Sequence, residues 1–461
     1  MKGKGRESTA FFCTSCGNES SRWQGQCKAC GEWNTLKEEP KAPSVKGKAG
    51  SVRHSWTGGK TELIDLEGVK SESKTMRFGS GVGEFDRALG GGIVLGSIVL
   101  LGGDPGIGKS TLLLQTLSLC AANRKVYVTG EESPSQVADR AKRLGLQTKG
   151  IQILAETQLE QILHHAKDLQ SGDLLVIDSI QTLYSEAIGS APGTVTQVRE
   201  CAQQLVRLAK QKNVAVILIG HVTKDGNLAG PRVLEHMVDA VLYFEGDPQS
   251  PHRLIRAFKN RFGAAQELGA FEMTEQGLVS IDNPSSMFLN AQRNKTSGSC
   301  VFAYQEGPRP ILLEVQALMD DMQGSKAQRL SVGLDSNRIN MLLAVLHKHG
   351  SLAIADQDVF VNVVGGLKVQ ETAGDLAVAF ALLSSLSNRP LPLDLVCFGE
   401  LGLTGELRPV QRSEDRLREA ARLGFKKAII PMRNMPQNPP KGLKVMGAES
   451  LAQAIALMGS V

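Results

Sequence analysis

One junction in the first third of the chain constrains its fold more than any other feature. The apolar run SIVLLGG (97–103) predicts a buried strand, and KSTLLLQTLSLCAAN (109–123) predicts a helix. The link between this strand and this helix could be an ordinary glycine-rich turn. The sequence pattern of the link indicates instead a loop whose backbone N–H groups hold phosphate. That link, GGDPGIGKST, contains G-x-x-x-x-G-K-[ST] at Gly103, Gly108, Lys109 and Ser110.

The predicted loop would bind ATP together with Mg²⁺. Lys109 can reach the β- and γ-phosphate oxygens, and Ser110 can ligate the metal. Asp178 ends the run DLLVID and can bind the same Mg²⁺ directly or through water, although an aspartate that caps a helix is the alternative. The expected nucleotide-binding loop consists of Gly103, Asp104, Pro105, Gly106, Ile107, Gly108, Lys109, Ser110 and Thr111.

Hydrolysis also needs a carboxylate that orients or deprotonates water. Glu131 and Glu132, in VYVTGEES, follow the second predicted strand, at the sheet edge where ligands of open α/β folds bind. Either can serve; we take Glu131 as catalytic, mainly because of the resemblance described below. His221, in LIGHVTKDG, can sense the γ-phosphate or be a structural histidine.

Strands alternate with helices from about residue 76, which predicts a mostly parallel sheet covered on both faces. One helix is expected to begin with Ser133 as its cap and Pro134 at its first position. The runs AVLYFEG and RLIRAFKN predict an antiparallel pair. Further strands are expected at 125–130, 173–178 and 214–220, and a long helix at 195–213.

The 461 residues are too many for one ordinary core. We expect a cysteine module at 11–35, a flexible linker at 36–65, an α/β domain at 66–284 and an α+β domain at 285–461, with hairpin-like strands at 286–318 and a helix in NRINMLLAVLHKHG. A formal charge of +5 permits nucleic-acid binding without requiring it. Without a long apolar run or a secretory signal, we expect a cytoplasmic protein with no membrane span.

The cysteine module has the spacing C-x2-C-x10-C-x2-C. Four thiolates can close a tetrahedral shell, so we expect a structural zinc site; disulfides or a redox pair are the alternatives. We expect the side chains of Trp23, Trp33 and Arg22 to pack on the zinc loops; contact with a nucleic-acid base or a partner protein is the alternative. The predicted ligands are Cys13, Cys16, Cys27 and Cys30, and the scattered Cys120, Cys201, Cys300 and Cys397 are expected to be buried free thiols.

The stretch FKNRFG (258–263) carries two cations and a glycine. In an extended chain Lys259 and Arg261 point to the same face, because side chains alternate across a strand. Two cations on one face indicate an anion-binding function.

These motifs together resemble the bacterial RadA (Sms) DNA-repair family. The resemblance rests on the cysteine module, GEFDRALGGGIVLGSIVLLGGDPGIGKST, VYVTGEES and KNRFG, and it covers nearly the whole chain. It implies a RecA-like ATPase core in a homo-oligomeric, hexameric ring that moves along single-stranded DNA. It also implies action with the RecA recombinase on branched recombination intermediates, by branch migration, in DNA repair.

The resemblance implies roles for individual residues. Lys109 is the Walker A lysine, Asp178 the Walker B aspartate and Glu131 the catalytic glutamate. In related rings, cations at the position of Lys259 and Arg261 cross the subunit interface to a neighbour's ATP, which implies catalysis in trans. DNA would contact the loops after the third and fourth strands, where Lys224, Arg232 and Arg199 can hold phosphates and Tyr184 can stack on a base.

The C-terminal part resembles the proteolytic domain of Lon proteases, with two departures. Thr372, in ETAG, stands at the position of the nucleophilic serine, and Glu414 at that of the lysine base. We therefore expect a non-proteolytic scaffold that helps assemble the ring and offers DNA a basic surface. A KaiC-like ATPase without DNA and an ATP-dependent peptidase are the rival functions. The candidate basic residues are Lys326, Arg329, Arg338, Lys368, Arg389 and Arg408.

Overall fold

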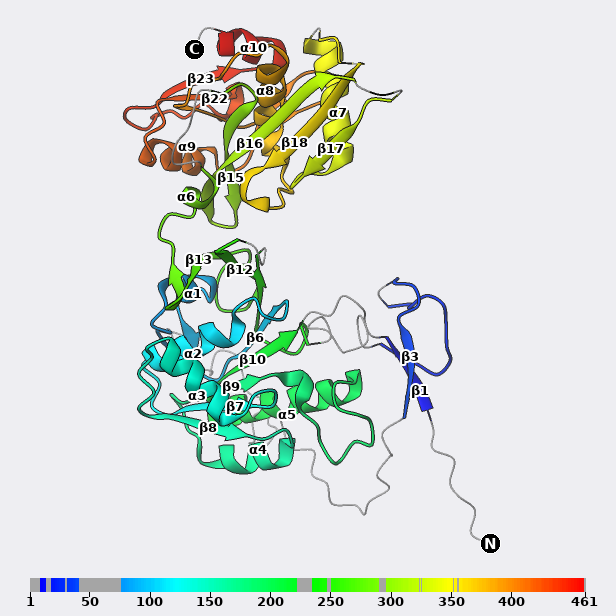
Figure 1. Cartoon of the computed structure of the whole chain (residues 1–461), viewed down its shortest axis with the longest axis vertical. Coiled ribbons are helices and arrows are strands. Elements are labelled where there is room, and N and C mark those ends of the chain that lie inside the picture. The colour runs from blue at the N-terminus through cyan, green and yellow to red at the C-terminus, as the bar shows by residue number, and fades with distance from the viewer. Residues whose placement is uncertain are drawn as a thin grey trace, which may run out of the picture. The chain divides into compact units, whose positions relative to one another are not determined.

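The computed structural model describes most of the chain, and it divides into two compact units, Met1–Ile281 and Asp282–Val461 (Figure 1). The described residues are 9–13, 18–29, 31–40, 76–221, 234–246, 250–289, 296–322, 324, 326–350, 352–354 and 356–459.

The first unit is built on a sheet in which nine described strands follow the order β14-β13-β12-β11-β6-β10-β9-β7-β8. The strands from β11 to β8 in this order are parallel, and β12, β13 and β14 extend the sheet antiparallel. The expected mostly parallel sheet and the antiparallel pair β11–β12 are confirmed. The bounds are β6 Ile98–Gly103, β7 Lys125–Thr129, β8 Ile151–Ala155, β9 Leu174–Asp178, β10 Ala215–His221, β11 Ala240–Glu245, β12 His252–Asn260, β13 Leu268–Thr274 and β14 Gly277–Ser280.

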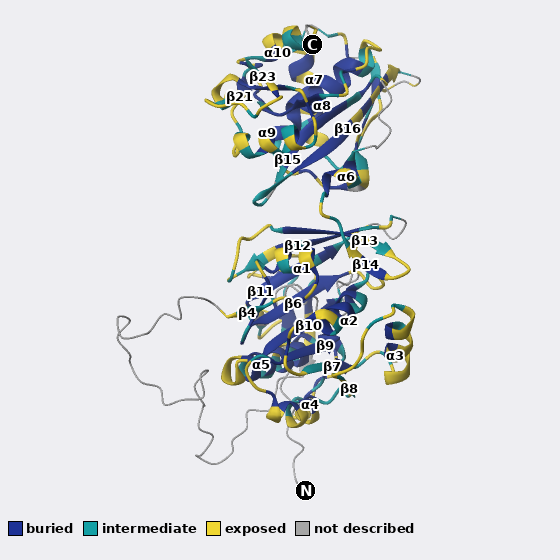
Figure 2. Ribbon diagram, turned by 90° about the vertical axis from the view of Figure 1, so that its left-hand side faces the viewer, coloured by how far each residue is buried: buried dark blue, intermediate teal, exposed yellow. Residues whose placement is uncertain are grey.

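Helices cover both faces of this sheet, and its central strands are buried throughout (Figure 2). One apolar core joins α1 (Gly83–Ala88), α2 (Lys109–Leu119) and α3 (Pro134–Arg143) to one face of the sheet. A second core joins α4 (Leu159–His165) and α5 (Val195–Lys212) to the other face. The short strands β4 (Arg77–Phe78) and β5 (Ile93–Val94) pair with each other beside α1.

The local signals for α3 act as expected. The Ser133 side chain accepts a hydrogen bond from the backbone N–H of Gln136, the Gln136 side chain accepts one from the Ser133 N–H, and Pro134 is the first helical residue. This capping box satisfies two N–H groups that a helix start leaves unpaired.

One expectation for this unit is wrong, and two of its elements were not predicted. The predicted helix 109–123 ends at Leu119, because the chain becomes extended at Cys120 and the Asn123 N–H donates to Gly172 O, 3.0 Å away. The sequence analysis also missed β8 and α4. Strand β8 lies at the sheet edge with its side chains partly exposed, so it lacks the continuous apolar run of its neighbours.

The second unit is an α+β fold around a sheet in which seven described strands follow the order β17-β18-β16-β15-β19-β22-β23. Strands β15 and β16 form the expected hairpin, and α7 lies where a helix was predicted. The bounds are β15 Ser299–Glu306, β16 Arg309–Asp321, β17 Arg329–Val332, β18 Gln357–Val363, β19 Leu395–Cys397, β20 Glu400–Leu401, β21 Leu407–Arg408, β22 Lys427–Pro431, β23 Lys444–Ala448, α6 Ser285–Phe288, α7 Ser336–Gly350, α8 Asp375–Leu386, α9 Ser413–Arg422 and α10 Leu451–Gly459.

One part of the predicted strand segment 286–318 is helical instead. Pro284 has helical φ and ψ angles and precedes α6, in which the N–H groups of Ser286 and Met287 donate to the carbonyls of Asn283 and Pro284. A proline favours the start of a helix because its φ angle is already helical.

The cysteine module forms a small sheet of its own in the order β2-β1-β3, with β1 at Thr9–Cys13, β2 at Glu19–Ser20 and β3 at Leu36–Pro40. Strand β3 pairs with β1 along its whole length, so the expectation that a flexible linker begins at residue 36 is wrong. The rest of the expected linker, to residue 65, lies outside the described residues.

Within the described part of the chain, no helix is both long enough and apolar enough to cross a membrane.

Candidate active site

The loop between β6 and α2 adopts a conformation that requires glycine at two motif positions. Gly103 and Gly108 have φ angles of 152° and 119°. A Cβ atom at Gly103 would lie 2.8 Å from Phe244 O, and one at Gly108 would lie 2.6 Å from Met273 Cε. The backbone therefore packs against β11 and β13 more closely than any side chain would permit.

Lys109, the first residue of α2, is only 4% exposed. Its Nζ donates to Gly103 O and Asp104 O, each at 2.8 Å, and lies 3.2 Å from His221 Nδ1. Burial lowers the pKa of this amine to about 8, against the opposing effects of Asp178, Glu131 and Asp104. The ammonium group lies against the loop that would hold phosphates.

Asp178, the last residue of β9, accepts a hydrogen bond from the Tyr127 hydroxyl, and the Ser110 side chain lies near its carboxylate. Burial raises the pKa of this carboxyl group, and the two hydroxyl groups oppose that effect. The peptide bond after Asp178 is cis. Ser110 and Asp178, the two predicted Mg²⁺ ligands, therefore lie together.

Tyr127 is a residue of this site that the sequence analysis missed. It is 1% exposed on β7, beside β9 in the sheet. A buried tyrosine needs a partner for its hydroxyl group, so a tyrosine in the otherwise apolar run of KVYVTG was the available signal.

Glu131 and Glu132 have different surroundings. The Glu131 Oε1 accepts a hydrogen bond from Ser179 Oγ at 2.5 Å and lies 3.1 Å from His221 Nε2. The hydrogen bond with His221 is the largest of the effects that lower the pKa of Glu131 to about 2. Glu132 instead forms an ion pair with Arg140 of α3. Only Glu131 of the two therefore joins the cluster beside the loop.

The carboxyl ends of β7, β9 and β10 bring three possible metal ligands together. One ligand atom each from Glu131, Asp178 and His221 lies within 4.8 Å of the other two. Carboxylate oxygens, together with the Ser110 hydroxyl, suit Mg²⁺, which also keeps several waters. A carboxylate next to a metal site can orient a water molecule for attack on phosphorus.

Lys259 and Arg261 both turn toward the segment that precedes β11. Lys259 Nζ donates to Glu235 O at 2.7 Å and Val238 O at 2.8 Å, and Arg261 Nη1 lies 3.4 Å from Asp239 Oδ1. Strand β12 ends at Asn260, so the strand alternation that placed both cations on one face does not extend to Arg261. The Arg261 side chain remains 58% exposed.

Asn260 and Gly263 also belong to the stretch FKNRFG, and they contact Leu89 and Gly90, which precede β5. Asn260 Nδ2 donates to Leu89 O at 3.0 Å, and Gly263 approaches Gly90 so closely that a Cβ atom there would lie 2.9 Å from the Gly90 Cα. Arg77, which the sequence analysis missed, donates to the carbonyls of Gly90 and Phe262.

The cysteine module buries the two predicted zinc ligands that are described. Cys13 and Cys27 are 0% and 1% exposed and share a small core with Leu36. Gly31, with a φ angle of 75°, forms the turn after Cys27 through a bond from its N–H to Cys27 O, 2.8 Å long. Two buried thiols beside such a turn fit a thiolate-bound zinc ion. Cys16 and Cys30 lie outside the described residues.

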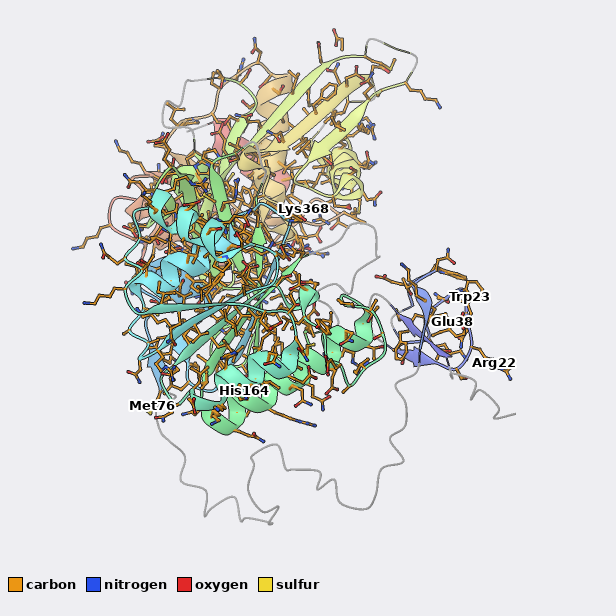
Figure 3. The ribbon with its side chains drawn as sticks, turned by 60° about the horizontal axis from the view of Figure 1, so that its bottom comes forward. Arg22, Trp23, Glu38, Met76, His164 and Lys368 are labelled. Atoms are coloured by element: carbon orange, nitrogen blue, oxygen red, sulfur yellow. The ribbon has the colours of Figure 1, made fainter. Side chains whose placement is uncertain are left out.

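The aromatic residues of the module do not pack as predicted. Trp23 and Trp33 are 59% and 69% exposed, although Trp33 lies over Gly25. Figure 3 shows Arg22 and Trp23 reaching outward from the ribbon of the module. The small core of the module, as far as it is described, consists of Cys13, Cys27 and Leu36 with Phe11 packed against it, and it includes neither indole ring.

In the C-terminal unit the residues at the two Lon-like catalytic positions have different partners. Thr372 Oγ1 donates to Glu400 Oε2 at 2.6 Å, whereas Glu414 pairs with Arg418 and is 64% exposed. No hydrogen bond joins Thr372 to Glu414 in the described residues. The buried Arg416 instead forms two hydrogen bonds with Glu371, beside Thr372.

The candidate DNA-binding residues fall into three groups. Lys224 and Arg232 lie outside the described residues, while Arg199 is exposed on α5 and Tyr184 is half-buried. Arg338 was offered as part of a free basic surface, and this is wrong, because its guanidinium pairs with the buried carboxylate of Asp375. The other C-terminal candidates are exposed: Lys326, Arg329, Lys368, Arg389 and Arg408.

The scattered cysteines are buried free thiols, as predicted. They are Cys120, Cys201, Cys300 and Cys397.

Three family models match separate parts of the chain. Residues 11–38 match a rubredoxin metal binding domain, residues 84–227 an AAA domain, and residues 332–434 a domain described as subunit ChlI of Mg-chelatase. A DNA repair protein RadA from Pseudomonas aeruginosa is 54% identical over 96% of this chain and 97% of its own length. The chain belongs to the RadA family of DNA repair proteins.

Other members of the RadA family agree with this assignment. The RadA proteins of Salmonella typhimurium and Bacillus subtilis are 51% and 46% identical, over 97% and 96% of this chain and 98% and 97% of their own lengths. Among solved structures, the RadB recombinase is 25% identical with a TM-score of 0.36, covering 44% of this chain and 99% of its own. The family predicted from the motifs is confirmed, and the AAA domain supports an ATP-hydrolysing enzyme.

Proposed function

We propose that this protein is a DNA-dependent ATPase of the helicase type, which moves along single-stranded DNA and processes recombination intermediates. It would work as a homo-oligomeric, hexameric ring in the cytoplasm, together with the RecA recombinase, and promote branch migration during DNA repair. The observation that carries the proposal is the convergence of Lys109, Asp178 and Glu131 beside the glycine loop in a chain of the RadA family.

The proposed chemistry is assigned to the chain's own groups. The loop from Gly103 to Thr111 binds the phosphates, and Lys109 neutralises charge on the β- and γ-phosphates. Ser110 and Asp178 would hold Mg²⁺, which stabilises that charge further. Glu131 orients the attacking water, and its low pKa keeps the carboxylate ionised at neutral pH.

His221 would report the state of the γ-phosphate. Its two ring nitrogens lie 3.2 Å from Lys109 Nζ and 3.1 Å from Glu131 Oε1. A phosphate that attracts Lys109 would disturb both contacts, and His221 directly precedes a loop proposed to contact DNA.

Lys259 and Arg261 are proposed to act on the ATP of an adjacent subunit. The exposure of Arg261 supports this role, because a guanidinium group that is 58% exposed beside its contact with Asp239 can reach across an interface. To reach a neighbour's ATP, Lys259 would have to leave its two carbonyl partners, Glu235 and Val238. The alternative role for Lys259 is to hold the segment around Val238 in place.

The flanking domains would support the motor. A structural zinc ion bound by Cys13, Cys16, Cys27 and Cys30 would hold the N-terminal module. The C-terminal unit would be a non-proteolytic scaffold, because the hydroxyl group of Thr372 donates to the carboxylate of Glu400 and not, among the described residues, to an amine that could remove its proton. Lys224, Arg232 and Arg199 remain the proposed DNA contacts.

ATP turnover of the purified chain, measured with and without single-stranded DNA, tests the proposal, and a casein digestion serves as control. We expect stimulation by DNA, unwinding of a tailed duplex and no digestion. Turnover that is indifferent to DNA would favour the KaiC-like alternative, and digestion that is lost in Thr372→Ala would favour the peptidase.

A further inference from the structure

Strand β12 carries a buried arginine that the proposed mechanism does not use. Arg253 is 7% exposed, and its Nε donates to the main-chain oxygen of Ile107 at 3.2 Å. Its Nη1 donates to Ser250 O and to His252 O, the latter at 2.8 Å. Since Ile107 belongs to the glycine loop, this side chain ties the loop to the connection between β11 and β12.

The bond to Ile107 determines which way the loop's peptide groups face. The peptide unit between Ile107 and Gly108 is not cis, and in a planar trans peptide the C=O and the following N–H point in opposite directions. With the Ile107 oxygen held toward Arg253, the Gly108 N–H points to the other side of the peptide plane. An N–H that keeps its direction before ligand arrives needs no reorganisation to bind phosphate.

Arginine is suited to this task. A buried guanidinium group is costly unless its N–H groups are bonded, and its planar fork fixes the direction of each bond. Space for the side chain comes from Gly246, where a Cβ atom would lie 2.8 Å from Arg253 Cδ.

The same antiparallel extension also holds the helix that follows the loop. Gln115 of α2 donates to Leu278 O at 3.1 Å and accepts from Leu278 N at 2.9 Å, and Leu278 belongs to β14. Strand β12 thus restrains the phosphate loop itself, through Arg253, whereas strand β14 restrains the helix that follows the loop.

We propose that Arg253 is a positioning residue for nucleotide binding, which holds the Ile107–Gly108 peptide in its phosphate-binding orientation. The inference rests on the ATP-binding part of the proposed function and is independent of DNA, of ring assembly and of Lys259. In this proposal Arg253 acts on the phosphates through the loop and not by direct contact.

The test compares the full-length wild-type protein with Arg253→Met, which keeps a long apolar stem without donors, and Arg253→Lys, which keeps the charge without the fork. Arg256→Ala is the matched control, because Arg256 lies on the same strand and pairs with Glu245. The readouts are the Kd of a fluorescent ADP analogue, the KM and kcat for ATP, and the melting temperature without nucleotide.

Loss of a hydrogen bond from a charged donor should weaken nucleotide binding about tenfold or more in Arg253→Met, with KM raised further than kcat is lowered. Arg253→Lys should lie between Arg253→Met and wild type, and Arg256→Ala should bind like wild type. If Arg253→Met does not fold, Arg253→Lys and Gly246→Ala, which displaces the same side chain, decide instead.

Two outcomes overturn the inference. In the first, folded Arg253 variants bind nucleotide like wild type. In the second, Arg256→Ala weakens nucleotide binding and lowers the melting temperature as much as the Arg253 variants do. If the wild-type protein itself bound no nucleotide, the proposed function would fail first, so the two failures are distinguishable.

Discussion

At the scale of residues, two adjacent glutamates of one loop differ in their bonding. Glu131 contacts Ser179 and His221 beside Asp178, whereas Glu132 is paired with Arg140 of α3. The sequence offered both at the right sheet edge. Which of them turns inward depends on α3, whose Arg140 holds Glu132.

Glu131→Gln tests this assignment with a nearly isosteric change. Without a carboxylate to orient water, turnover should fall about a hundredfold or more while nucleotide binding persists. Glu132→Gln is the control, and its turnover should stay close to wild type. Equal losses in steady-state ATPase assays of the two variants would contradict the assignment.

Tyr127→Phe tests the support of the proposed magnesium ligand. The variant removes the hydroxyl donor of Asp178 and leaves the ring in the core. Groups that orient a metal ligand typically affect metal affinity about 10- to 100-fold, so the Mg²⁺ concentration needed for half-maximal nucleotide binding should rise. An unchanged Mg²⁺ titration of the folded variant would show that the Tyr127 hydroxyl is not needed to orient Asp178.

At the scale of elements, Arg338 joins two helices of the C-terminal unit. Its guanidinium, on α7, bonds to both oxygens of Asp375 at the start of α8 and to Leu401 O. Asp375 is 4% exposed, and burial raises the pKa of its carboxyl group in spite of this pairing. A residue that looked like a free surface cation from the sequence therefore stabilises helix packing.

Arg338→Ala should destabilise this unit by about 3 kcal/mol, because it leaves a buried carboxylate without its cation. Chemical denaturation measures the change, and Lys368→Ala, at an exposed position, should leave stability unaltered. If Arg338→Ala reduced DNA affinity with no loss of stability, the surface role first assigned to Arg338 would be restored.

At the scale of the whole molecule, the proposed action of Arg261 in trans has a distinctive consequence. If the protein forms the proposed ring, Lys109→Ala subunits would lack the phosphate-binding lysine, and Arg261→Ala subunits would lack the cation offered to a neighbour. In mixed rings some interfaces combine an intact Lys109 site with an intact Arg261, so ATP turnover should partly recover over either variant alone. Cross-linking of tagged subunits verifies the mixing. If ATP turnover does not recover in verified mixtures, Arg261 acts in the chemistry of its own subunit or in DNA binding.

Zinc removal should affect the N-terminal module selectively. The module is a separate three-stranded sheet with its own small core, and metal binding stabilises such modules by about 10 kcal/mol. We expect one zinc per chain by elemental analysis, and chelation should release it without lowering the melting temperature of the ATPase unit. A chain that binds no zinc, or Cys27→Ser with unchanged zinc content, would contradict the four-thiolate site.

From the residues alone one could predict the glycine loop, the parallel strands around it, the capped start of α3, the cysteine module and the family. These features depend on local properties: apolar runs, a proline at a helix start, and residue types at fixed spacing. Side-chain partners depend on strands that are distant in the chain, so they became known only from the folded structure. It brought Tyr127 to Asp178, Arg253 to Ile107 and Arg338 to Asp375, because a buried polar group must find its hydrogen bonds wherever the fold provides them.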